Sequence, residues 1–501
     1  MARRLFKWFG IGGLLTVALI LVMVQSVVGL PSITSKGLYW SSIQKNSWTA
    51  SNVFYAFDQQ ITITTLEFTY VEKASSATVE NNQRLFKWVK SIQIENLIIH
   101  HQDQTYNTGL GGSLHPQVLL ESDWLHIARQ NNTWQVGGTF DSTNIPLILS
   151  PHLPDLPQDV TIQHQFSFEV TNFREPITGK LQNIEITYPL LGKNIRMPTL
   201  DVQVHANNPQ EVQFSTKKST VKWTGKHTDE DWTVNYSIAL QDLVEWFDIQ
   251  IPHTKVEGDW MGTLTPQETT ITGVDLGFEG QIYALSRLQS GLPITYQPIH
   301  AEQTQMIGPN TPAWVPYNKL GWMAKTVIAG EDAPFFTHDG FNTEGLNRAV
   351  KDIREQRQNP AGGSSITQQL AKNLFTGNRQ TLDRKIEEMV YTLALEHTLS
   401  KEGILTLYLN AIEFGEGIYG IKEACNKYFL KDPAHLTLKE AVFLAAILPN
   451  PREGYRRAKR GRPPTARMRV ILQNLVDGQQ ITKVDMQIAL GEPLRLLLPV
   501  E

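Results

Sequence analysis

Hydrophobic and polar positions follow three successive patterns along the 501-residue chain. Phe9–Leu30 is an almost unbroken apolar run, and short runs of alternating apolar and polar residues follow as far as about Ile282. Beyond residue 319 the apolar residues recur with a helical period instead. Alternation predicts half-buried strands, whereas the longer period predicts helices. The sequence therefore predicts a multidomain protein with an N-terminal transmembrane helix, a β-rich antiparallel domain and then an all-α domain.

The apolar run predicts a membrane anchor. At about 1.5 Å per residue, its length matches a hydrocarbon core of about 30 Å. Arg3, Arg4 and Lys7 precede the run, which places the N-terminus in the cytoplasm and the rest of the chain on the far side. No small-x-small cleavage site is evident before Pro31, so we expect an uncleaved anchor rather than a signal peptide. Residues 1–30 are thus predicted to form a cytoplasmic tip and the anchor, with a buried core helix as the alternative.

Residues 31–290 predict antiparallel strands with one solvated face. The expected strands are Ile61–Phe68, Ser91–Ile99, Val160–Val170, Leu181–Tyr188, Leu200–Val204, Glu211–Phe214, Ser219–Trp223, Trp232–Ile238 and Thr269–Phe278. Two helical exceptions are expected, at Thr78–Lys90 and Leu240–Phe247. No metal-ligand spacing, phosphate loop or catalytic motif occurs here, so this domain has no assigned role. Its strand pattern resembles β-rich envelope proteins of the AsmA type, in composition alone.

Prolines and glycines crowd residues 291–318, a stretch that favours neither helix nor strand and predicts a linker. A helix then ends at Glu331, with Leu320, Met323 and Val327 on one face. Further helices are expected at Glu344–Gln358, Ile366–Phe375, Leu382–Leu399, Lys401–Asn410, Ile418–Tyr428, Leu438–Ile447 and Thr465–Val476. We expect the helical domain to cover residues 319–480 and a tail to cover 481–501.

Charge and cysteine content narrow the classes of protein. The net charge of −4 divides into +3 for residues 1–30, −10 for 31–300 and +3 for 301–501. The C-terminal part is therefore the one suited to an anionic partner. The single cysteine, Cys425, excludes an internal disulfide framework.

Five motifs crowd into the helical region. In Glu331–Gly340, two adjacent carboxylates precede an aromatic pair, a histidine and a glycine that can turn the chain. Gly362–Asn373 contains a Ser-x-x-Gln capping box, which starts a helix behind two glycines. Arg384–Glu388 opens a long helix, Tyr408–Asn410 precedes a glycine-rich loop, and Glu440–Pro451 completes the set. Together these motifs are far more specific than any one of them alone.

In order and spacing, the five motifs resemble the signatures of the peptidoglycan glycosyltransferases, glycosyltransferase family 51, whose monofunctional members are biosynthetic transglycosylases. The resemblance covers about Trp314–Tyr455. It implies a lysozyme-like glycosyltransferase fold for residues 319–480. It also implies inverting polymerisation of lipid II into β-1,4 glycan strands with release of undecaprenyl pyrophosphate. The expected location is the bacterial inner membrane, with the bulk of the chain in the periplasm.

This reaction sets the chemistry expected of the site. Pyrophosphate leaves without being protonated, so the reaction needs a base for the attacking 4-hydroxyl and cations for the departing charge. Glu331 matches the first acid of the family's first motif and is the candidate base. A lone Glu-Asp pair would more often be a salt-bridge partner. By spacing alone either Glu387 or Glu388 could serve beside Lys385, and the family's Arg-Lys-x-x-Glu pattern selects Glu388 as the second catalytic candidate.

The remaining candidates are expected to contact substrate. They are Asp332, His338, Ser364, Ser365, Gln368, Gln369, Lys372, Asn373, Arg379, Arg384 and Lys385. Asp332 is expected to orient its loop, and His338 to belong to the site without a chemical role. The family usually has an arginine at the position of Gln380, so Arg379 is the candidate substitute, and whether it reaches the pyrophosphate stays open.

Two other classes remain open. A lytic transglycosylase would share the helical fold, but cleaving a glycosidic bond needs an acid at the leaving oxygen rather than cations. An inactive envelope scaffold or lipid-handling protein would not need intact motifs.

Expected partners are lipid II, the nascent glycan strand and inner-membrane lipid, with cell-wall or envelope proteins for the β-rich domain and no nucleic acid. No metal site or cofactor is predicted, although a divalent cation at the pyrophosphate stays open. A loose linker further predicts that Met1–Ser35 joined to Gln303–Glu501 is an active polymerase.

Overall fold

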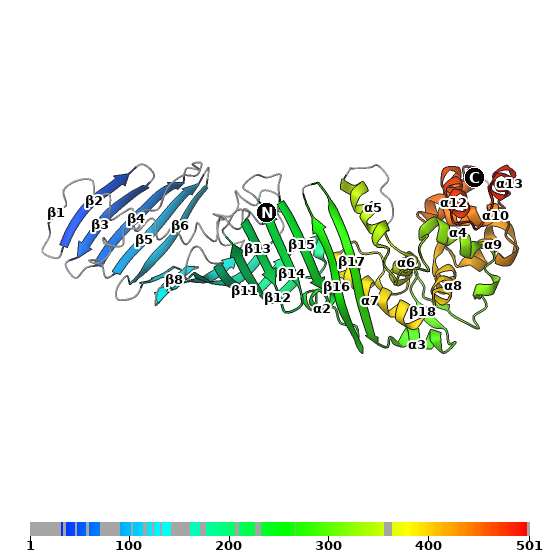
Figure 1. The fold of residues 1–501 in the computed structure, drawn as a ribbon, viewed down its shortest axis with the longest axis horizontal. Helices are drawn as coiled ribbons and strands as arrows, with labels where there is room; N and C mark the ends of the chain where they lie inside the picture. The colour runs from blue at the N-terminus through cyan, green and yellow to red at the C-terminus, as the bar shows by residue number, and fades with distance from the viewer. Residues whose placement is uncertain are drawn as a thin grey trace. The chain divides into compact units, whose positions relative to one another are not determined.

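The computed structural model describes residues 32–33, 37–45, 48–56, 60–70, 91–101, 104–113, 118–122, 125–130, 133–141, 161–170, 177–205, 210–225, 232–265, 267–354 and 363–497. The chain divides into two compact units, Met1–Tyr236 and Ser237–Glu501. Strands build the first unit, and the second contains the α-helices of the described residues (Figure 1).

The first unit is a meander, in which the described strands from β1 to β14 each pair with the next along the chain. These pairs are antiparallel except β4 with β5, which is parallel. The strands are β1 (Ser32–Ile33), β2 (Gly37–Lys45), β3 (Trp48–Ala56), β4 (Gln60–Tyr70), β5 (Ser91–His101), β6 (Gln104–Ser113), β7 (Val118–Glu121), β8 (Leu125–Gln130), β9 (Thr133–Asp141), β10 (Thr161–Val170), β11 (Ile177–Thr187), β12 (Ile195–His205), β13 (Gln210–Ser215) and β14 (Thr220–Gly225). A further strand, β15 (Trp232–Ala239), spans the boundary between the two units.

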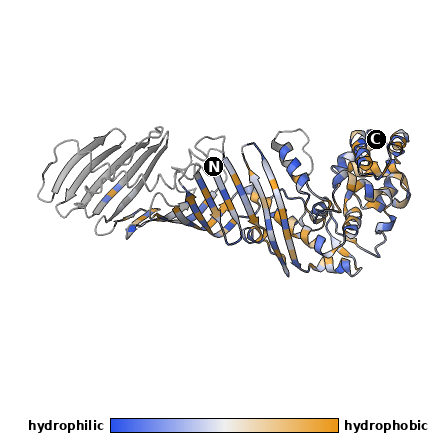
Figure 2. Cartoon of the chain, in the orientation of Figure 1, coloured by the Kyte–Doolittle hydropathy of each residue, from blue (hydrophilic) through white to orange (hydrophobic). Residues whose placement is uncertain are grey.

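Buried and exposed residues alternate along these strands, as the alternating sequence pattern predicted. On β12, Val202 and Val204 are buried whereas Asp201 and Gln203 are exposed. The two valines form a cluster with Phe168, Val212 and Trp223 from neighbouring strands. Figure 2 shows hydrophilic and hydrophobic residues alternating along the strands.

Two predictions about this region need comment. All strands were expected to be antiparallel, but β4 and β5 run in the same direction, which requires a connection longer than a hairpin, and residues 71–90 separate the two strands. The expected helix Thr78–Lys90 and the expected anchor Phe9–Leu30 both lie outside the described residues. Among the residues that are described, no helix has the length and apolarity needed to cross a membrane.

The second unit begins with elements that the sequence assigned to the β-rich domain. Helix α2 (Leu240–Trp246) matches its prediction and packs against β16 (Thr254–Leu264). β16 pairs with β17 (Thr269–Gly280), which contacts helices of the same unit. Helix α3 (Tyr283–Gln289) follows, and its Leu285 and Leu288 are part of the helical core.

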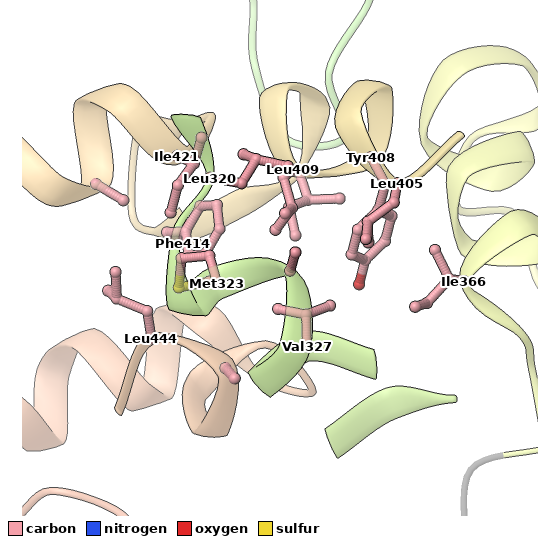
Figure 3. Packing of buried hydrophobic residues seen from close by; sticks show 14 of the residues in the cluster. Leu320, Met323, Val327, Ile366, Leu405, Tyr408, Leu409, Phe414, Ile421 and Leu444 are labelled. Carbon is pink, nitrogen blue, oxygen red and sulfur yellow. The ribbon is translucent and has the colours of Figure 1, made fainter. Parts of the chain in front are cut away.

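Helices build the rest of the second unit. They are α4 (Trp322–Glu331), α5 (Thr343–Arg354), α6 (Ile366–Ala371) continued by the π-helical turn η5 (Lys372–Thr376), α7 (Leu382–Thr398), α8 (Lys401–Ala411), α9 (Ile421–Phe429), α10 (Leu438–Ile447), α11 (Pro451–Lys459), α12 (Thr465–Asp477) and α13 (Lys483–Gly491). Their apolar faces meet in one cluster, in which Val327 of α4 and Leu409 of α8 are fully buried (Figure 3). The last helical position of α4 is Glu331, as predicted.

Residues 291–318 were expected to form a linker, but the structure builds part of this stretch into the helical core. Ile294 and Tyr296 lie on β18 (Ile294–Tyr296), which pairs with β19 (Gln305–Ile307), and both residues are buried in the helical core. The Tyr296 hydroxyl donates to the carbonyl of Ala411 at 2.9 Å, and the side chain of Asn410 bonds both backbone groups of Val315. Prolines and glycines exclude long helices here, but the apolar residues between them still pack into the core.

The C-terminal domain also differs from the all-α prediction. Besides β18 and β19, strands β20 (Glu413–Gly415) and β21 (Ile418–Tyr419) form a hairpin where the sequence predicted the start of a helix. The expected tail contains α13, which Thr482 and Asp485 begin with a capping box. The backbone N–H of Leu497 donates to the carbonyl of Tyr428 at 2.9 Å. The architecture is therefore an antiparallel sheet followed by a helical domain that carries small hairpins.

Candidate active site

A cavity of about 1070 Å³ lies within the second unit and collects most of the predicted site residues. Its walls come from the end of α4, the start of α5, helices α6 to α8, and α12. The predicted residues on its surface are Glu331, Asp332, Ser364, Gln368, Gln369, Lys372, Asn373 and Glu388.

Glu331 is held on the cavity wall by two neighbours. The Arg467 guanidinium donates to Glu331 Oε1 at 2.7 Å, and the Gln369 amide donates to Oε2 at 3.0 Å. The carboxylate is 9% exposed. Burial raises the pKa of Glu331, while Arg467 and Gln369 oppose that rise. A raised pKa makes the carboxylate a stronger base once it has lost its proton.

Gln369 is fixed in turn by Tyr408 on α8. The Tyr408 hydroxyl donates to Gln369 Oε1 at 2.8 Å, which leaves the amide nitrogen directed at Glu331. Burial raises the pKa of Tyr408, so the hydroxyl keeps its proton. Tyr408 packs in the helical core and also positions a hydrogen-bond donor of the site.

Asp332, the residue after Glu331, contacts His338 and the start of α6. Asp332 Oδ2 accepts from the backbone N–H of Ile366 at 3.0 Å, and Asp332 Oδ1 lies 3.0 Å from His338 Nε2. The N–H of Gly340 donates to His338 Nδ1 at 3.1 Å, so both ring nitrogens have partners. Gly340 has a φ of 90°, which only glycine adopts readily. Asp332 thus connects the loop to the start of α6 and lines the cavity, whereas His338 is absent from the residues that line it.

The capping box predicted for Ser365 is present. Ser365 Oγ accepts from the N–H of Gln368 at 3.1 Å, and Gln368 Oε1 accepts from the N–H of Ser365 at 3.0 Å. Ser365 Oγ also donates to the carbonyl of Gly340 at 2.5 Å. Ser365 thus joins the first two motifs and is buried, whereas Ser364 faces the cavity.

Lys372 stands at the point where α6 widens into the π-helical turn η5. Such turns often occur at functional sites. Burial, and next the neighbouring Arg384, lower the pKa of the Lys372 amine. Asn373 Nδ2 donates to the carbonyl of Gln369 at 2.8 Å. Lys372 is therefore a half-buried lysine on the cavity wall, close to other cations.

Glu388 binds two cations of the third motif. Arg384 Nη1 donates to Glu388 Oε2 at 2.6 Å, and Lys385 Nζ bonds Glu388 Oε1. The Glu388 side chain is only 3% exposed. Glu387 instead lies near Arg379, so the two glutamates diverge as their helical spacing predicts.

Arg379, the candidate substitute for the family's arginine, lies beside two acids of α7. Its guanidinium lies 3.6 Å from both Asp383 and Glu387, and its side chain is 59% exposed. Arg379 is not among the residues lining the described cavity. Two acids on the first turns of α7 hold it away from the site.

Several cavity residues were missed by the sequence argument. Arg467 lies 136 positions from its partner Glu331, and no local spacing connects the two. Arg348, Arg452 and His300 also line the cavity. Within the described residues, no group of three or more acids, histidines and cysteines is arranged to hold a metal ion.

Removing the Arg467 charge should shift the pH dependence of the reaction. The carboxylate of Glu331 loses a favourable neighbour in Arg467→Gln, so its pKa rises further and the base forms only at higher pH. We expect the acid limb of the kcat/KM profile to move to higher pH. Arg469→Gln, an exposed arginine on the same helix, is the control. An acid limb that stays in place in both variants would separate Arg467 from the titration of Glu331.

A buried carboxylate and several cations around one cavity suit an anionic substrate. The Transglycosylase family matches residues 300–476. A biosynthetic peptidoglycan transglycosylase from Thiobacillus denitrificans is 45% identical over 140 residues, which are 28% of this chain and 60% of that protein. The protein of the same name from Acinetobacter baumannii is 41% identical over 161 residues, which are 32% of this chain and 71% of its own length. The chain belongs to the biosynthetic peptidoglycan transglycosylase family.

A solved structure of penicillin-binding protein 1A from Haemophilus influenzae also matches. It is 31% identical and covers 20% of this chain and 14% of its own, with a TM-score of 0.18.

Proposed function

We propose that this protein polymerises lipid II into β-1,4 glycan strands, with inversion at C1 and release of undecaprenyl pyrophosphate. The observation that carries the proposal is the placement of Glu331, Lys372 and Glu388 on one cavity, in a chain that belongs to a transglycosylase family. The anchor Phe9–Leu30 would hold the enzyme in the inner membrane, where its lipid-linked substrate lies.

The proposed reaction forms one bond and breaks one. The 4-hydroxyl of an incoming disaccharide attacks C1 of the donor sugar, and Glu331 takes the hydroxyl proton. The C1–oxygen bond to the lipid pyrophosphate breaks, and the leaving group departs as an anion. Lys372 supplies a positive charge to the cavity. Glu388 holds Arg384 and Lys385, which are not among the lining residues but are close enough to Lys372 to lower the pKa of its amine.

The proton balance favours this reaction over glycan cleavage. Glu331 is hydrogen-bonded by two donors, Arg467 and Gln369, an arrangement that suits the carboxylate form. A lytic enzyme needs a protonated acid at the leaving oxygen. The second acid, Glu388, is already paired with two cations.

Purified protein offered both substrates would decide between the two activities. Labelled lipid II should be converted into glycan chains that a muramidase degrades, and isolated peptidoglycan should release no soluble fragments. Fragment release from peptidoglycan without consumption of lipid II would overturn the proposal. Absence of both activities in a folded protein would favour the scaffold class.

Substitutions of Lys385 test whether a positive charge at this position is needed to use the lipid II donor. Lys385→Ala should reduce use of the lipid II donor by more than Lys385→Arg, because the departing pyrophosphate needs a charge there. The arginine variant can still bond Glu388, as Lys385 does. KM and kcat for both variants are measured against wild type. Equal losses in the two variants would assign Lys385 to packing rather than to charge.

A further inference from the structure

The wall of the cavity formed by α5 is attached to the β16–β17 hairpin. Asn347 on α5 uses both ends of its side-chain amide on one residue of β17. Asn347 Oδ1 accepts from the N–H of Ile271 at 2.7 Å, and Asn347 Nδ2 donates to the Ile271 carbonyl at 3.0 Å. This pair reproduces the bonding that another strand would give at that point. Figure 1 shows α5 beside β17.

A second contact fixes the chain just before the helix. Phe341 is buried, and its ring packs edge-on against Trp260 of β16, with centroids 5.8 Å apart. Asn342 then accepts from the N–H of Gly345 at 2.8 Å and starts the helix. The hairpin therefore holds both the entry to α5 and its first turns.

Other faces of the same turns line the cavity. Asn342, Gly345 and Arg348 are on the cavity surface, whereas Asn347 is not. At 100° per residue, Asn347 points about 200° away from Gly345. Arg348, the next residue, points about 100° from Asn347, so one face of α5 contacts the sheet while an adjacent face presents Arg348 to the cavity. Any movement of α5 relative to β17 would change where that positive charge stands.

We propose that Asn347 is a positioning residue, which fixes α5 to β17 so that Arg348 stands in place for the anionic substrate. The last hairpin of the sheet is then a working part of the transferase site rather than a separate module. This inference rests on the proposed function, under which the anion that Arg348 meets in the cavity belongs to lipid II.

Two variants break the attachment from opposite sides. Asn347→Leu removes both bonds from the helix. Ile271→Pro removes the backbone donor from the strand, at a position whose N–H faces away from β16, where proline is tolerated. Lys255→Ala, an exposed residue of β16, is the control. The melting temperature of each variant is measured to establish that it is folded.

The readouts are steady-state kinetics with labelled lipid II and hydrogen exchange of the α5 amides. We expect faster exchange in α5 and a KM raised about fivefold to tenfold with kcat within about twofold of wild type, in both variants but not in the control. Unchanged exchange, or faster exchange with an unchanged KM, would overturn the inference. A wild-type enzyme that ignores lipid II would instead overturn the proposed function, and this inference with it, while exchange still reports the attachment.

Discussion

Replacing Glu331 by glutamine should slow lipid II polymerisation by at least ~10²-fold. Glutamine keeps the volume of the side chain, and its carbonyl oxygen can still accept from Arg467 or Gln369, but it cannot take the proton of the attacking hydroxyl. A factor of that size corresponds to about 2.7 kcal/mol of transition-state stabilisation. The initial rate of glycan formation, measured with saturating lipid II, reports the loss.

The matched control is Glu416→Gln, which changes an exposed acid of the β20–β21 hairpin. This variant should keep wild-type turnover. If Glu331→Gln melts at the wild-type temperature and turns over within threefold of wild type, Glu331 has no part in the mechanism.

Joining Met1–Ser35 directly to Gln303–Glu501 should abolish folding of the helical domain. The deletion removes Leu285, Leu288 and Ile294 from the core cluster. Each such side chain contributes about 1.5–3 kcal/mol when buried. Together the three losses approach the 5–15 kcal/mol that is about the net stability of a typical domain. The deletion also leaves β19 without β18, and the carbonyl of Ala411 without the Tyr296 hydroxyl.

A longer version isolates the cause. Joining Met1–Ser35 to Ser237–Glu501 keeps the whole second unit, and we expect it to unfold cooperatively and to polymerise lipid II. Circular dichroism melting and glycan synthesis are measured for both proteins. A shorter protein that melts cooperatively and is active would show that the buried contacts of residues 285–302 are dispensable and would restore the linker interpretation.

Local signals in the sequence located the helices and much of the site. Helix α10 begins and ends where its hydrophobic period predicts, and α6 begins at the predicted capping box of Ser365. The motifs also bring Glu331, Lys372 and Glu388 to one cavity. These features depend on neighbours within a few residues, or on a pattern shared with a family.

Long-range contacts could not be predicted in this way. Arg467 contacts Glu331 because α12 packs against α4. No sequence pattern near either residue predicts that contact. The sequence left open whether Arg379 reaches the pyrophosphate, and it could not show that the guanidinium lies near Asp383 and Glu387. The attachment of α5 to the sheet through Asn347 joins segments that are 76 positions apart.

The central claim is that the cavity around Glu331 joins lipid II units into glycan. The most direct measurement is incubation of the full-length protein with labelled lipid II in detergent, followed by electrophoretic separation of the products, with Glu331→Gln in parallel. The account predicts a ladder of glycan chains from the wild-type protein and almost none from the variant. Unchanged lipid II with a folded wild-type protein, or equal ladders from both proteins, would contradict it.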